Sequence, residues 1–447
     1  MISDKQSSLL EVILKKAALA GADGADIIMI ENNALNTSCR LGKPENIERS
    51  EGQDIGLRVF IGQKQAIVST NDFRKEAIDS MVSQALSMAQ VVPEDPYCGL
   101  IPHKELARNW PDLELTDNFV PSPTNLIDWA KRAEDSARAV SGVTNSEGAD
   151  ASWGRSKVSL ATSEGFIGSY ERSQFSLSAS VIAGTGTSME RDYEWSSTCF
   201  EEDLISPEKI GAKAGHGAVN RLNPKKAISG VIPVIYDPRV SNSIVSHMAN
   251  AISGTTIARG TSFLIDQLGQ SIFAPSINII DEPHRSRGLR SRPFDGEGFS
   301  TSTSNIIKNG VLNTWLLDHR AAKQLKLKTT GHASRGTNSI PSSSPSNLYM
   351  QGGNLTPIEL MKDIDDGLYV TELIGMGVNS VTGDYSRGAA GFWIKDGEKA
   401  FPVNELTIAG NLKDMFLKLT PANDLSFRFG INAPTIRIDG MTVAGQQ

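Results

Sequence analysis

The residue that most invites a chemical interpretation is His247, near the middle of a helix predicted from Pro238 to Ile252. Asp237 can cap this helix, Pro238 suits its first position and Gly254 follows its end. A zinc site on one helix needs two imidazoles and a carboxylate that deprotonates the attacking water. His247 therefore needs such companions before it can act as a metal ligand.

The neighbours of His247 do not supply that chemistry. If the pattern His-Glu-x-x-x-His is aligned on this helix, Asn242 takes the place of the first ligand and Ser243 that of the base. An amide binds zinc poorly, and a hydroxyl does not accept the proton. We therefore predict no metal ligand and no catalytic residue in this chain. Two alternatives stay open: His247 is a core histidine hydrogen-bonded to a neighbour, or it pairs with Ser243 or Ser246 in an independent hydrolase.

Other catalytic signatures are missing from the sequence. It contains no Gly-x-Ser-x-Gly elbow, no phosphate loop and no His-Glu-x-x-His motif. Cys39, Cys98 and Cys199 are far apart, so neither a disulfide framework nor a Cys-x-x-Cys metal knuckle is expected. If the chain takes part in catalysis, we expect it to do so as one subunit of a larger assembly.

A second candidate site is the polar, glycine-rich segment Gly375–Gly391, which precedes a predicted strand from Phe392 to Lys395. Glycines permit close backbone approach, and unpaired backbone beside a strand can accept an extended peptide. The candidate peptide-binding residues are Asn379, Asp384, Tyr385 and Arg387. A bulged strand with tight turns explains the same composition, so this alternative stays open.

The elements that must position these residues indicate an α+β fold with two domains, residues 1–225 and 226–447. The first is predicted to hold a twisted sheet with flanking helices, and the second to be β-rich with the helix of His247 as its one prominent helix. Helices of the first domain are expected at 8–20, from a cap at 71–72 to 93, at 122–140 and after Ser206. Its strands are expected at 26–31, 56–61, 65–69, 158–161 and 175–181.

In the second domain, turns that join hairpin strands are predicted at Asn309-Gly310, Asp396-Gly397 and Asp439-Gly440. The segment 329–353 is rich in Ser, Gly, Asn and Pro. We predict that it is either a functional loop, which could close over a ligand, or disordered.

Charge and composition limit the classes of partner. The 447 residues carry 51 acidic and 44 basic side chains, a net charge of −7 without a basic run, so nucleic acid is not an expected partner. The charged residues of the first predicted helix do not fit a signal peptide. No apolar run reaches the ~18 residues of a membrane-spanning helix, and we expect no membrane partner and a cytoplasmic location.

Three segments resemble the PmbA/TldD family of peptidase-like proteins, historically named modulators of DNA gyrase. They are Gly377–Trp393, Pro402–Leu412 and His247–Gly254, and the resemblance extends over both domains. The family has a catalytic branch with His-Glu-x-x-x-His and a zinc-binding cysteine, and a partner branch, PmbA/TldE, without them. Only His247 maps onto that motif, so the resemblance is to the partner branch.

The resemblance implies a subunit of a two-subunit zinc metallopeptidase that degrades or processes unfolded peptides. Zinc would be bound by a paralogous TldD-like subunit, and this chain, inactive alone and without a cofactor, would contribute to the substrate groove. The alternative is a self-associating peptide-binding or adaptor protein without a catalytic partner. The working dimer and the physiological substrate stay open.

Overall fold

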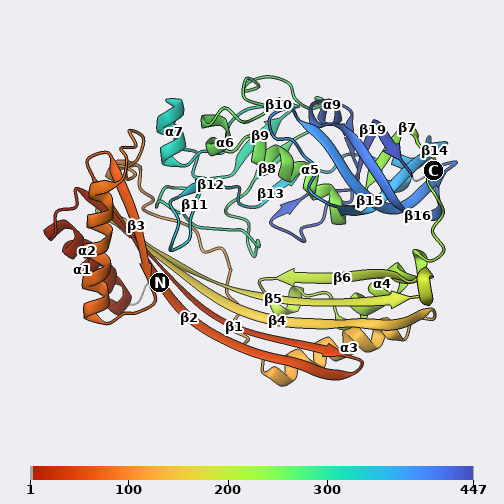
Figure 1. The fold of residues 1–447 in the computed structure, drawn as a ribbon, viewed down its shortest axis with the longest axis horizontal. Coiled ribbons are helices and arrows are strands. Elements are labelled where there is room, and N and C mark those ends of the chain that lie inside the picture. Colours follow the sequence, from red (N-terminus) through yellow and green to blue (C-terminus); the bar gives the residue numbers. More distant parts are fainter. Residues whose placement is uncertain (1–3, 446–447) are drawn as a thin grey trace.

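The first part of the chain builds one sheet of long strands. The computed structural model describes residues 4–445, and in it six antiparallel strands follow the order β3-β2-β1-β4-β5-β6 (Figure 1). The strands are β1 (Gly24–Arg40), β2 (Lys43–Ile61), β3 (Lys64–Thr70), β4 (Val143–Thr162), β5 (Ile167–Ala183) and β6 (Glu190–Thr198). Each predicted strand of this region lies within one of these, but β1, β2, β4 and β5 are 17 to 20 residues long and extend far beyond the prediction.

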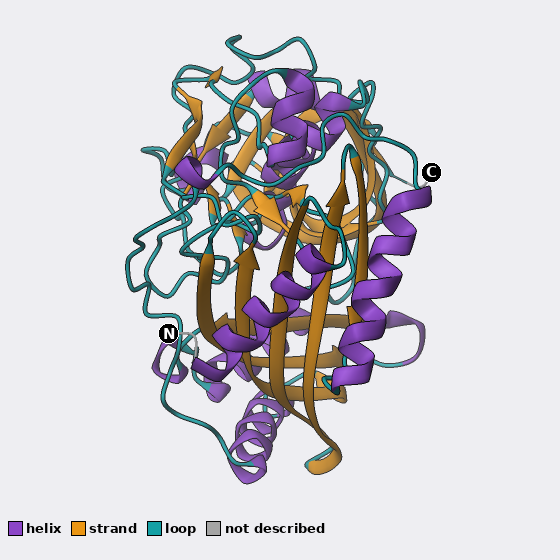
Figure 2. Ribbon diagram, turned by 90° about the vertical axis from the view of Figure 1, so that its left-hand side faces the viewer, coloured by secondary structure: helices purple, strands orange, loops and turns teal. Residues whose placement is uncertain are grey.

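Two pairs of helices cover one face of this sheet (Figure 2). Helices α1 (Asp4–Leu19) and α2 (Lys75–Val91) pack on alternate residues such as Ile27 and Met29. Helices α3 (Pro123–Arg138) and α4 (Pro207–Asn220) pack further along the same face, on Leu35 and Trp153. Short 3-10 turns lie at η1 (His103–Glu105), η2 (Gly186–Ser188) and η3 (Glu201–Asp203). The opposite face of the sheet is left for the second half of the chain (Figure 1).

The second half is built around a sheet that closes on itself. Its order is β16-β15-β14-β7-β19-β17, and closure follows because β16 also pairs with β19. The strands are β7 (Gly230–Tyr236), β14 (Asp366–Ile374), β15 (Asp384–Lys395), β16 (Glu398–Asn411), β17 (Leu419–Pro421) and β19 (Ile436–Ala444). The α+β prediction is confirmed, and the proposed domain boundary at residues 225 and 226 falls between α4 and β7.

Smaller elements surround the closed sheet. A five-stranded sheet contains β10 (Val311–Leu312), β9 (Ser304–Lys308), β8 (Ile279–Asp281), β13 (Leu348–Met350) and β18 (Ile431–Asn432). The helices are α5 (Pro238–Ala251), α6 (Gly254–Ala258), α7 (His319–Leu325), α8 (Pro357–Met361) and α9 (Leu412–Leu417). No described helix meets the length and hydropathy needed to cross a membrane.

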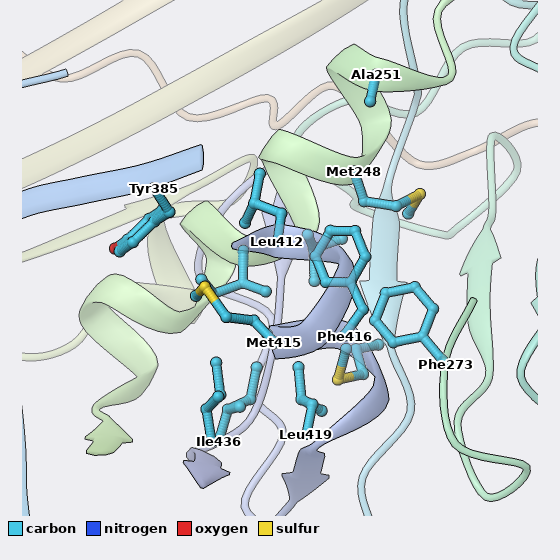
Figure 3. Packing of buried hydrophobic residues seen from close by; sticks show 14 of the residues in the cluster. Met248, Ala251, Phe273, Tyr385, Leu412, Met415, Phe416, Leu419 and Ile436 are labelled. Atoms are coloured by element: carbon cyan, nitrogen blue, oxygen red, sulfur yellow. The ribbon is translucent and has the colours of Figure 1, made fainter. Parts of the chain in front are cut away.

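The core of the second half lies between α5, α9 and the sheets. The ring of Phe416 stacks on that of Phe273 with a centroid distance of 4.6 Å, and both rings lie beside Met248 of α5 (Figure 3). Met415 and Leu412 of α9 belong to the same buried cluster. This packing fixes the inner face of α5 and leaves its other face for the surface of the domain.

Gly254 follows the end of α5 as predicted, and it also begins α6, with its N–H donated to the Leu316 carbonyl. Two local predictions are wrong. Helix α2 has Arg74 as its N-cap, because the Asp72 carboxylate accepts the Arg74 N–H in a turn before the helix. Asp439-Gly440 is no hairpin turn: β19 runs through it, with a register shift there. The Asn309-Gly310 and Asp396-Gly397 turns are confirmed, with positive φ at all four residues.

The segment 329–353 is ordered and joins the two halves of the molecule. It contains β11 (Ala333–Ser334) and β12 (Ser342–Ser343), which pair with each other. Between them the buried Arg335 side chain binds Asp26 of β1, which also binds Arg58. Of the two predicted states, disorder is therefore wrong for this segment, and closure over a ligand stays a prediction.

Candidate functional site

A cleft of about 670 Å³ lies between the long sheet and the C-terminal domain. We call it the interdomain cleft. The long sheet contributes Glu147, Gly148, Asp150, Ser178, Ala179, Ser180, Arg191 and Tyr193, and the C-terminal domain contributes Arg239, Val240, Asn242, Ser243, Glu372, Leu373 and Arg387. Its volume is typical of a ligand site.

Helix α5 forms part of one wall of this cleft. It begins as predicted, because the Asp237 side chain accepts the Arg239 N–H at 2.9 Å and Pro238 occupies the first turn. Asn242 and Ser243 line the cleft, whereas His247 is not among the lining residues. On a regular helix Asn242 and His247 point about 140° away from each other, whereas Ser243 and His247 are only about 40° apart.

His247 is directed toward the protein interior. Its ring meets that of Tyr385 edge to face, with centroids 6.0 Å apart. Burial and then the positive charge of Arg387 lower the pKa of His247 to about 4, so its imidazole is neutral at pH 7. Its buried Nε2 has no hydrogen-bond partner within the described chain, so the predicted hydrogen bond to a neighbour is not made through that atom.

The serines near His247 are engaged elsewhere. The Ser243 hydroxyl donates to the Val240 carbonyl at 2.6 Å, and the Ser246 hydroxyl donates to the Asn242 carbonyl at 2.9 Å. Neither therefore forms the serine–histidine hydrogen bond that an independent hydrolase would use.

The donor set around α5 does not fit a zinc ion. His247 is the one imidazole of the helix, Asn242 and Ser243 are poor zinc ligands, and the buried Cys199 lies beside Gly288. Between residues 4 and 445 no three His, Cys, Asp or Glu side chains are grouped in a way that could hold a metal ion. We therefore assign no chemical step on this chain to a metal.

The four candidate peptide-binding residues lie in three different settings. The Asn379 side chain accepts backbone N–H groups of the 379–382 turn, and the Asp384 carboxylate accepts from Thr382 and Asn411, which lowers its pKa. Tyr385 is buried, and its hydroxyl lies 3.4 Å from that of Tyr236. Of the four, Arg387 lines the interdomain cleft.

Strand β15 pairs with β16 from Asp384 to Lys395 and with β14 from Gly388 to Lys395, with register shifts near Gly391. On the β14 side, Tyr385 forms an isolated bridge to Val378. From Gly388 onward both edges are paired, which fits a bulged strand preceded by tight turns and leaves no room there for an added peptide strand. A peptide contacting Arg387 would therefore reach it from the cleft.

Ion pairs that join the two halves of the molecule beside the cleft were not predicted from the sequence. Arg239 of α5 donates to Asp192 of β6 at 2.8 Å and to the Tyr193 carbonyl at 3.0 Å. Burial lowers the pKa of Arg239, but the bonds to Asp192 raise it further, so the guanidinium stays charged. Arg221 donates to Glu372 of β14 at 2.5 Å. The partners are tens of residues apart or more, and a charge pattern along the chain does not identify such pairs.

Three family models match the chain. The PmbA/TldA metallopeptidase domain 1 matches residues 25–89, the central domain matches 117–222 and the C-terminal domain matches 229–445. The Metalloprotease PmbA of Escherichia coli O157:H7 is 36% identical over 448 residues, which cover 99% of this chain and 98% of that protein.

Solved structures share the fold over the whole chain. A candidate modulator of DNA gyrase from Bacteroides thetaiotaomicron is 25% identical, with a TM-score of 0.92 and complete coverage of both chains. TldE from Thermococcus kodakarensis is 20% identical, with a TM-score of 0.87, and covers 98% of this chain and 100% of that one. At that identity the second likeness concerns the fold.

Proposed function

The chain belongs to the PmbA/TldA metallopeptidase family, and we propose that it is the subunit of a two-subunit zinc metallopeptidase that helps to form the peptide groove and binds no zinc itself. In this proposal a TldD-like paralogue binds the zinc ion and performs the hydrolysis of unfolded peptides in the cytoplasm. The interdomain cleft is this chain's contribution to the groove.

The observation that carries the proposal is the composition of the α5 wall of the cleft. In a metallopeptidase family, this wall presents Asn242 and Ser243, and the remaining imidazole of His247 is turned inward and neutral. The wall keeps polar groups that can hydrogen-bond a peptide and lacks the ligands that would activate water. Both features support a subunit that binds peptide and does not catalyse its hydrolysis.

The first experiment tests the division of labour. The chain is purified alone and mixed with a paralogue that carries His-Glu-x-x-x-His, and both samples are assayed for bound zinc and for hydrolysis of an unfolded, fluorescence-quenched peptide. We expect no zinc and no hydrolysis from the chain alone, and hydrolysis in the mixture above that of the paralogue alone. Zinc-dependent cleavage by the isolated chain would refute the proposal.

The same experiment distinguishes the proposed subunit from the alternative, a self-associating peptide-binding or adaptor protein. If the chain self-associates and binds peptide but leaves the activity and mass of the paralogue unchanged, the adaptor function is favoured. A variant pair sharpens the result. Arg239→Met removes the ion pair that joins α5 to β6 and should lower the gain in activity, whereas Arg259→Met, an exposed arginine outside the cleft, should leave it unchanged.

A further inference from the structure

The interdomain cleft contains an arginine without an anionic partner. Arg239 is paired with Asp192, and Arg191 lies 3.4 Å from Glu147. Arg387 takes part in none of the ion pairs found between residues 4 and 445, and its Nε lies 3.5 Å from the Ile374 carbonyl, which is a long contact. The fork of the Arg387 guanidinium is therefore available to a ligand.

An arginine in this setting favours a carboxylate ligand. The guanidinium stays charged under all physiological conditions and presents donors whose geometry matches the two oxygens of a carboxylate. Arg387 is partly buried and lines a cavity, so the charge is only partly solvated. An anion that enters the cleft would provide the Arg387 guanidinium with a partner of opposite charge.

The two rings beside Arg387 carry no charge: His247 is neutral, and Tyr385 keeps its proton because burial raises the pKa of Tyr385 to about 12. The Glu372 carboxylate of the same wall is bound by Arg221. On α5 the Ser243 proton is donated to a helix carbonyl, but the Asn242 amide has no side-chain hydrogen bond within the described chain and lines the cleft. The Arg387 guanidinium and the Asn242 amide thus both line the C-terminal wall and both have donors to offer a ligand.

The opposite wall limits how acidic the ligand can be. Glu147 and Asp150 of β4 line the cleft, and the Asp150 side chain has no ion pair or hydrogen bond in the part of the chain that is described. A ligand with several negative charges would be repelled there, while a peptide with one carboxylate near Arg387 would not be.

We propose that Arg387 binds the C-terminal carboxylate of the peptide in the interdomain cleft, with the Asn242 amide as a second donor. The inference rests on the proposed function, and it states which end of the peptide this chain holds. The subunit would accordingly recognise peptides by their free end, largely independently of sequence.

The test measures, by titration calorimetry, binding of three unlabelled pentapeptides of alanine, leucine and glycine to the full chain, alone and with the catalytic paralogue. One peptide has a free C-terminal carboxylate, one a C-terminal amide, and one an amide with glutamate as its last residue. We expect the free acid to bind about tenfold more tightly than the plain amide, as one charge-assisted bidentate contact implies. Arg387→Met should remove this preference, Arg387→Lys should restore part of it, and the outside control Arg259→Met should keep it.

The outcomes are distinguishable. If the peptides bind but acid and amide bind equally, or if Arg387→Met keeps the preference, the assignment to Arg387 is wrong while the proposed function stands. If the glutamate amide binds as tightly as the free acid, the ligand is any carboxylate and the claim for the C-terminus fails. If no peptide binds to the chain or to the mixture, both the inference and the proposed function are wrong. Thermal unfolding of each variant identifies any loss caused by misfolding.

Discussion

The replacement Glu297→Gln should make the stability of the protein less dependent on pH. Glu297 is buried beside Arg58 and Asp295, where the two halves of the molecule meet, and its carboxylate accepts the His319 N–H at 2.9 Å. Burial is the main cause that raises the pKa of Glu297 from 4.5 to about 8; the charge of Arg58 opposes the shift and that of Asp295 adds to it.

The sign follows from proton linkage. Between pH 4.5 and 8 the folded state holds the Glu297 proton and the unfolded state has released it, so stability falls as the pH rises and levels off above pH 8. Each pH unit within this window corresponds to about 1.4 kcal/mol and the whole window to roughly 5 kcal/mol. Glutamine imitates the protonated acid, can still accept from His319 and does not titrate.

The assay is urea unfolding of the wild type, Glu297→Gln and the exposed control Glu48→Gln across the window from pH 5 to pH 8. We expect the advantage of Glu297→Gln over the wild type to grow with pH and that of Glu48→Gln to stay constant. Parallel curves for the wild type and Glu297→Gln would show that Glu297 titrates as an ordinary carboxyl, and the reasoning from burial would be wrong.

Two further predictions concern packing. Gly56→Ala would place a Cβ 1.9 Å from the Thr337 carbonyl oxygen, so we expect destabilisation of about 3 kcal/mol or more and faster proteolysis of the segment 329–353, whereas the matched control Gly52→Ala meets nothing within 4 Å and should change little. Phe416→Ala should cost about 3 to 5 kcal/mol in unfolding free energy because its ring is fully buried on Phe273, and Leu417→Ala, whose side chain is 53% exposed, should cost far less.

How much the sequence predicts depends on whether a residue's environment is local. The caps of α3 and α5 and two hairpin turns depend on neighbouring residues, and they were found from the sequence. The length of β2 was not found, because residues 43–54 are exposed at every position and carry no alternation of apolar and polar side chains. Asp439-Gly440 has the composition of a turn, yet pairing with β7 on both sides of the register shift keeps it in a strand.

For the candidate site too, some residues were identified from the sequence, whereas their arrangement depends on the fold. Asn242, Ser243, His247 and Arg387 were identified from the sequence, but which of them face a common space depends on the turn of α5 and on the pairing of β15. Asp150 and Glu372 were missed, because they enter the cleft from strands that lie far away in the sequence. The capping residues predicted the helix, and the geometry of the cleft selected Arg387 among the four candidates.

The two walls of the interdomain cleft are fixed relative to each other before any ligand binds. Arg239 joins α5 to β6, and Arg428 joins the C-terminal domain to Glu194 of the same strand. At the far end of the sheet, Arg335 is held by Asp26, with its side chain fully buried. Ion pairs of this kind contribute little net stability, but losing one partner leaves a buried charge, so they hold the domains in one arrangement. If a peptide binds in the cleft as we propose, it meets preformed walls, and less binding free energy is lost to ordering the protein.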